Sequence, residues 1–91
     1  MRYHPLVSRW QDLVESARAS PANIRFRDLC GLVVYLGYSL DRQSGSHLIY
    51  RHSSRRDVPM VNLQEARAGK AKPYQVRQIL GLIDTYKLEV K

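Results

Sequence analysis

The 91-residue sequence lacks the features of several protein classes, beginning with cysteine and long apolar runs. Its single cysteine, Cys30, excludes an internal disulfide and a zinc site made of several thiolates. The longest apolar stretch, residues 30–36, contains Gly31 and is far shorter than the roughly 20 residues of a membrane-spanning helix. The first residues include no apolar segment typical of a secretory signal, and no glycine-rich phosphate loop is found. We therefore expect a cytoplasmic protein without membrane association and without a cofactor.

The composition is that of one small globular domain spanning residues 1–91, with 44% hydrophobic and 25% charged residues. A chain of this length buries only about 60–65% of its unfolded surface, which leaves no room for a second domain or a large enclosed pocket. Lys and Arg number 15 against 8 Asp and Glu, so the formal net charge is +7. Such a surplus favours polyanionic partners, nucleic acids above all.

Most of this positive charge lies in the C-terminal half, in two windows without an acidic residue, 42–56 and 66–82. The basic residues of these windows are Arg42, Arg51, Arg55, Arg56, Arg67, Lys70, Lys72 and Arg77. One such cluster alone is commonly a solvated basic face. Two of them in one small domain favour a surface that binds phosphate groups.

The spacing of apolar and turn-forming residues predicts six elements in the order α–α–β–β–β–α. The expected helices span residues 6–19, 25–36 and 74–86, and the expected strands span residues 38–42, 46–52 and 58–63. The residues expected on or near the buried stripe of the second helix are Phe26, Leu29, Cys30, Val33, Val34 and Leu36. Because short turns join the strands, we predict an α+β fold: a small antiparallel three-stranded sheet with helices on one face.

A histidine, His47, follows the turn expected at Ser44 and Gly45, at the start of the second strand. Rigid backbone near solvent suits a general acid or base, because an imidazole changes its charge between about pH 5 and 8. Strand alternation places His47 and Arg51 on one face, where both would meet the same phosphate, but it leaves open which face is buried. A structural role for His47 is the other interpretation. No metal site is expected, because His52 points to the opposite face and no carboxylate lies at ligand spacing.

A second candidate site lies just before the last helix, whose first turn contains Pro73. Lys70 and Lys72 stand there although the N-terminal end of a helix dipole is already positive. A bound anion would relieve that conflict, so we predict that both lysines bind phosphate. The alternative is that they simply extend into water.

Four more residues have side chains suited to nucleotides. Tyr50 and Tyr74 are either candidates for stacking on bases or core residues with exposed hydroxyls. Asn62 and Gln64, near the end of the third strand, either hydrogen-bond a nucleotide or close a turn.

The chain resembles the HicA family of toxin ribonucleases, in a longer form. The resemblance rests on Gly45-Ser46-His47, on the aromatic Tyr50 and, most of all, on the Lys-Ala-Lys-Pro-Tyr-Gln-Val motif at residues 70–76. It covers residues 9–88, with residues 23–91 as the HicA-like core and residues 1–22 as an additional N-terminal helix and linker. Shorter members carry Pro-x-His where this chain has Pro-Met-Val at residues 59–61.

This resemblance implies a fold similar to a double-stranded-RNA-binding domain, and a toxin that cleaves mRNA and is neutralised by a HicB-type antitoxin. It assigns the catalytic role to His47, supported by Gly45 and Ser46. The residues that we expect to bind RNA phosphates are Arg42, Arg51, Lys70, Lys72 and Arg77. A non-catalytic RNA-binding module of the same fold is the alternative, and an interaction protein that binds an acidic partner is a third interpretation.

Overall fold

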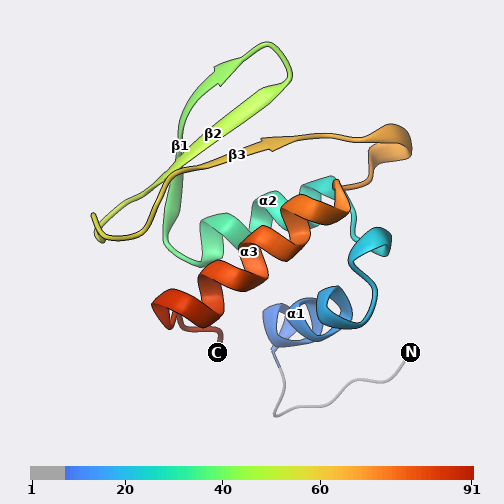
Figure 1. Ribbon diagram of the computed structural model, residues 1–91, viewed down its shortest axis with the longest axis horizontal. Coiled ribbons are helices and arrows are strands. Elements are labelled where there is room, and N and C mark those ends of the chain that lie inside the picture. Colours follow the sequence, from blue (N-terminus) through green and yellow to red (C-terminus); the bar gives the residue numbers. More distant parts are fainter. Residues whose placement is uncertain (1–7) are drawn as a thin grey trace.

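The computed structural model describes residues 8–91, which form three α-helices and a three-stranded sheet (Figure 1). The helices are α1 (Arg9–Ala19), α2 (Phe26–Tyr35) and α3 (Pro73–Tyr86), and the strands are β1 (Tyr38–Ser44), β2 (His47–His52) and β3 (Val61–Gln64). Two short 3-10 helices, η1 (Pro21–Asn23) and η2 (Arg67–Gly69), precede α2 and α3. This order confirms the predicted α+β fold and its similarity to the double-stranded-RNA-binding domain arrangement.

The sheet is antiparallel in the order β1-β2-β3 and has one covered and one open face. In Figure 1, α2 and α3 run along the same side of the sheet and α1 lies farther from it. Tyr50 and Leu63 point toward the helices and are 5% and 0% exposed. Alternation along β2 therefore directs His47 and Arg51 to the open face, where both are exposed. The structure thus settles which face is buried.

The core fills the space between the sheet and the helices. The largest fully buried side chains are Leu29, Leu32, Leu63, Ile79, Val33, Val61 and Val76. The prediction for α2 was wrong at Val34, which is 54% exposed. The buried residues of this helix lie three and four positions apart, at 29, 32 and 33, so Val34 falls on the opposite side.

Helix α1 packs on the core through its two buried residues, Val14 and Ala17. Ser8 caps its N-terminus in a capping box with Gln11, so the helix begins at Arg9; the expected start at residue 6 lies outside the described residues. The Trp10 ring stacks on Tyr35 with a centroid distance of 5.3 Å. No helix within residues 8–91 has the length and apolar character to cross a membrane.

The third strand was predicted three residues too early, because β3 begins at Val61 rather than at residue 58. Val58 belongs to the loop before β3, and its apolar side chain packs into the core, where it is 5% exposed. Pro59 has no N–H for a sheet ladder, and its carbonyl instead accepts a hydrogen bond from the Tyr38 hydroxyl at 2.8 Å. Strand β1, by contrast, runs two residues longer than expected, to Ser44.

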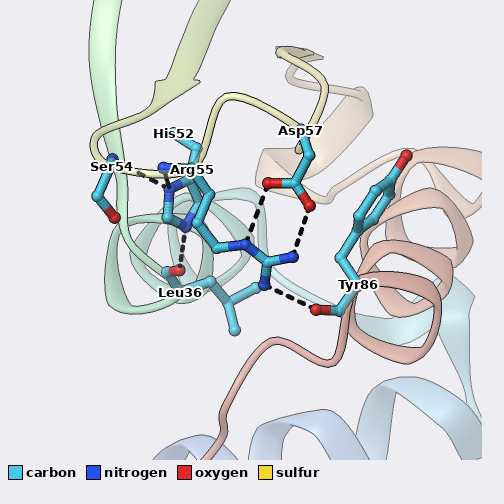
Figure 2. Close-up of polar contacts among 6 residues, drawn as sticks. All are labelled: Leu36, His52, Ser54, Arg55, Asp57 and Tyr86. Carbon is cyan, nitrogen blue, oxygen red and sulfur yellow. Dashed lines mark hydrogen bonds and ion pairs between the residues drawn. The ribbon is translucent and has the colours of Figure 1, made fainter.

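Polar contacts hold the end of β2 and the loop after it against the C-terminal ends of α2 and α3 (Figure 2). The Arg55 guanidinium binds both carboxylate oxygens of Asp57, at 3.2 and 2.7 Å, and donates to the Tyr86 carbonyl at 2.7 Å. The ring of His52 bonds the Leu36 carbonyl through Nε2 at 3.1 Å. Its Nδ1 accepts from the backbone N–H groups of residues 54 and 55, at 3.3 and 3.0 Å. The side chains of His52 and Arg55 therefore stabilise the fold around this loop.

Candidate active site

The turn between β1 and β2 places His47 at the edge of the open face. Gly45 has a φ of +59°, a conformation that favours glycine in a tight hairpin. Ser46 follows, and His47 is the first residue of β2, with an exposed side chain. The imidazole therefore stands on a rigid strand and remains accessible to a substrate.

Strand β3 supplies the hydrogen-bond partner of this ring. Asn62 lies opposite Ile49 in the sheet register, so its side chain shares the open face and lies diagonally beside His47. Its Oδ1 is 3.0 Å from Nδ1 of His47. Among residues 8–91 this is the ring's hydrogen-bond partner, and no hydrogen bond from these residues reaches Nε2. One ring nitrogen is thus held and the other is available.

A second row of hydrogen bonds runs beside the histidine. Lys72, the N-cap residue of α3, donates from Nζ to Oε1 of Gln64 at 2.6 Å. The Nε2 of Gln64 donates in turn to the Ser46 hydroxyl at 2.8 Å. Gln64 lies directly opposite His47 in the register, so the row passes next to the imidazole. We refer to Ser46, His47, Asn62, Gln64 and Lys72 as the polar cluster.

The backbone under the polar cluster is fixed by Gln75 of α3, which is only 4% exposed. Its Oε1 accepts from the Gln64 N–H at 3.1 Å, and its Nε2 donates to the Asn62 carbonyl at 3.2 Å. Residues 62 and 64 direct these backbone groups away from β2, so the side-chain amide takes the place of a neighbouring strand. Sequence reasoning did not assign this role, although a glutamine four residues before Ile79 occupies a position of the apolar stripe of α3.

Of the other predicted phosphate-binding residues, Arg42 lies diagonally beside His47, whereas Arg51 and Lys70 lie farther from the polar cluster. Arg51 is four residues from His47 along β2, about 13 Å away at roughly 3.3 Å per residue, and its Nε is 3.5 Å from Asp41. Arg51 does share the open face with His47, and its contact with the same phosphate stays a prediction. Lys70 is exposed, and its Nζ lies 3.4 Å from Oδ1 of Asn23. Arg42 is exposed on β1 opposite residue 49, on the face that carries the cluster.

The remaining candidates differ in their exposure. Tyr50 was a candidate either for stacking on a base or for the core; it is 5% exposed and faces the core, and burial raises the pKa of its hydroxyl. A buried ring has no free face for a nucleotide, so the core interpretation of Tyr50 is confirmed and the stacking interpretation is wrong. Tyr74 is 58% exposed and its hydroxyl accepts from Nε2 of Gln75 at 3.4 Å, while Arg77 is exposed on α3.

The chemistry that these groups support is proton transfer next to a bound anion. An exposed imidazole with one nitrogen held by an amide accepts a proton at the other nitrogen. The ammonium group of Lys72, on the neighbouring row, has two further N–H donors for an anionic oxygen. Within residues 8–91, no three His, Cys, Asp or Glu side chains gather in a metal-binding arrangement.

The fold and the polar cluster define a small α+β domain that carries an exposed histidine on the open face of its sheet. Residues 26–84, more than half of the chain, match the family described as HicA toxin of bacterial toxin-antitoxin. The chain therefore belongs to the HicA toxin family, as a toxin of a toxin–antitoxin system whose partner is an antitoxin. No curated protein and no solved structure matches it.

Proposed function

We propose that this toxin is an endoribonuclease that cleaves mRNA without a metal ion, with His47 as its general acid and base. The observation that carries the proposal is the position of His47: an exposed imidazole, hydrogen-bonded through Nδ1 at 3.0 Å, beside the ammonium-bearing row of the polar cluster. Membership of the HicA family adds independent support for a toxin activity.

The proposed reaction begins when His47 removes the proton of a ribose 2′-OH. The 2′ oxygen then attacks the adjacent phosphorus, and the bond from phosphorus to the 5′ oxygen breaks. The leaving oxygen takes a proton from the imidazolium, which restores the neutral ring. The products are a 2′,3′-cyclic phosphate and a 5′-hydroxyl, so DNA, which lacks the 2′-OH, is not a substrate.

Phosphate binding is assigned to the basic residues around the open face. Lys72 is hydrogen-bonded to Gln64, which is hydrogen-bonded to Ser46, the residue before His47. The ammonium group of Lys72 stabilises the negative charge that grows on the phosphate oxygens. Arg42 lies on the same face, opposite residue 49. Lys70 and Arg77 flank the start of α3 and extend the contact to neighbouring phosphates.

The proposal extends to the partner and the place of action. We assign the antitoxin to the HicB type, and we place the protein in the cytoplasm, where mRNA is available. A HicB-type protein encoded next to this chain, and co-purifying with it, would support the assignment, and co-purification with an unrelated neighbour would contradict it.

The test is incubation of the purified protein with end-labelled RNA in EDTA. We expect cleavage to 2′,3′-cyclic phosphate ends, and a rate for His47→Ala about 10²–10⁴-fold lower with RNA affinity nearly unchanged. Gln78→Ala, which removes an exposed amide from α3, is the matched control and should cleave like the wild type. Cleavage by His47→Ala at the wild-type rate would refute the role of His47. RNA binding without any cleavage would favour the non-catalytic module, which the fold also suits.

A further inference from the structure

The contact between His47 and Asn62 determines which ring nitrogen carries hydrogen. A neutral imidazole has one N–H and one lone pair, and an amide oxygen accepts hydrogen bonds only. With Oδ1 of Asn62 at 3.0 Å from Nδ1, the hydrogen lies on Nδ1 and the lone pair on Nε2. We propose that Asn62 is a positioning residue that holds His47 in this tautomer, so that Nε2 is the atom that accepts the ribose proton. The inference rests on the proposed function.

The surroundings of Asn62 favour this orientation of its amide. With Oδ1 bound to the imidazole, the Nδ2 group of this exposed side chain remains to donate to a substrate on the open face. The basic residues of that face, Lys72 and Arg42, suit a substrate whose phosphate oxygens are acceptors only. Free donors at this position therefore match the same substrate, whereas a free amide oxygen would repel it.

Asn62 is itself fixed from below by a buried amide. The Asn62 carbonyl accepts from Nε2 of Gln75 at 3.2 Å, and the Gln64 N–H donates to Oε1 of Gln75 at 3.1 Å. Because a backbone N–H only donates, the orientation of the Gln75 amide is unambiguous. The edge strand cannot shift without breaking both bonds, so the Asn62 side chain is presented at a constant place beside the ring.

The contact also becomes stronger during the reaction. When Nε2 takes the ribose proton, the ring becomes an imidazolium and the bond from Nδ1 to Asn62 becomes charge-assisted. Such a bond stabilises the charged intermediate more than the neutral ground state, and it keeps Nε2 directed at the leaving oxygen. We therefore expect the loss of Asn62 to lower kcat much more than it changes KM.

The tautomer of His47 can be read directly by nuclear magnetic resonance of the full chain with ¹⁵N-labelled histidine, at a pH above about 8 where imidazoles are neutral. Long-range ¹H–¹⁵N couplings distinguish an Nδ1–H ring from an Nε2–H ring. His52 provides an internal reference of the opposite kind: its Nδ1 accepts from two backbone N–H groups and its Nε2 bonds the Leu36 carbonyl. We expect Nδ1–H for His47 and Nε2–H for His52. An Nε2–H signal from His47 would overturn the proposal.

Substitutions at Asn62 then separate positioning from folding. Asn62→Leu removes the acceptor, so we expect His47 to populate both tautomers and kcat to fall about 10–100-fold, with KM within about threefold. Asn62→Asp keeps an acceptor, so we expect it to retain the Nδ1–H signal and most of the activity. Its carboxylate favours the imidazolium, which moves the acidic limb of the pH–rate profile to higher pH. Gln78→Ala is the control and should change none of these quantities.

The outcomes distinguish this inference from the proposed function. If His47→Ala cleaves like the wild type, the catalytic role of His47 fails, while the resonance spectra still report whether Asn62 sets the tautomer. If His47→Ala is inactive but Asn62→Leu keeps both the Nδ1–H signal and the wild-type kcat, the positioning role alone is refuted. If Asn62→Leu does not fold, Asn62→Asp still tests the proposal: loss of its Nδ1–H signal with the wild-type kcat retained would overturn it.

Discussion

Replacing Gln75 by methionine tests whether this buried amide holds the edge of the sheet. Methionine has a similar length and shape, so packing alone costs less than about 1.5 kcal/mol. The substitution leaves the Gln64 N–H and the Asn62 carbonyl without their partners at 3.1 and 3.2 Å. Each buried polar group without a partner costs about 1–3 kcal/mol. For the two groups together the cost is about 2–6 kcal/mol. Because the Asn62 side chain is exposed and water can reach the strand beside it, we expect a total loss in the lower half of this range, about 2–4 kcal/mol.

The free energy of unfolding is measured in urea by the fluorescence of Trp10, the single tryptophan. Amide hydrogen exchange supplies a local readout, since the Gln64 N–H should exchange much faster in the variant. Gln78→Met, at an exposed position of the same helix, is the control and should stay within about 0.5 kcal/mol of the wild type. An equally small change for Gln75→Met, with the Gln64 amide still protected, would refute the reasoning.

Three other predictions concern separate parts of the molecule. Lys72→Ala should lower the slope of log affinity against log salt for RNA by about one unit, and an unchanged slope would remove Lys72 from the phosphate contacts. The Arg18 guanidinium hydrogen-bonds Asp84 and lowers the pKa of that carboxyl below its unfolded value, so this pair stabilises the fold above that value and the stabilisation is lost as the pH falls. The difference in urea stability between wild type and Arg18→Ala should therefore shrink below about pH 4, and a constant difference would contradict it. Gly37→Ala should lower stability by about 2–3 kcal/mol, because φ is +109° and the new Cβ would lie 2.6 Å from Nε2 of His52; an unchanged melting temperature would contradict this.

The helices and most of the sheet followed from sequence because their signals are local. Apolar residues at helical spacing and the turn at Gly45 fixed the order of the elements. The start of β3 could not be predicted, because Val58 is a buried loop residue. The spacing of apolar residues does not distinguish a loop packed on the core from a strand. The buried face of β2 was also undecided, because Leu48 and Ile49 are both apolar. Only pairing with Leu63 and its neighbours shows that the face of Leu48 is covered.

The residues of the polar cluster were all noted in the sequence, but the hydrogen bonds that join them were not predicted. His47, Ser46 and Lys72 were singled out from turn chemistry, from helix-end electrostatics and from the resemblance, and Asn62 was noted as a polar residue near a strand end. Their hydrogen bonds depend on the register between β2 and β3 and on the direction in which α3 leaves the sheet. Register is a property of paired strands, so a single sequence gives no local signal for it. The same reason explains why Gln75, which acts only through β3, was not assigned.

The geometry of the site depends on four residues of β3. One row of hydrogen bonds runs from Lys72 through Gln64 to the β1–β2 turn, and the other runs from Gln75 through Asn62 to His47. Both rows cross β3, and a shift of one residue in its pairing would turn both of its polar side chains to the covered face. A change in register would therefore remove the proposed phosphate binding and the proposed proton transfer together, whereas Lys72→Ala should affect the first and His47→Ala the second. The buried amide of Gln75 binds the free edge of β3, a strand of only four residues. Its two hydrogen bonds therefore stabilise the fold and also keep Asn62 aligned with the imidazole.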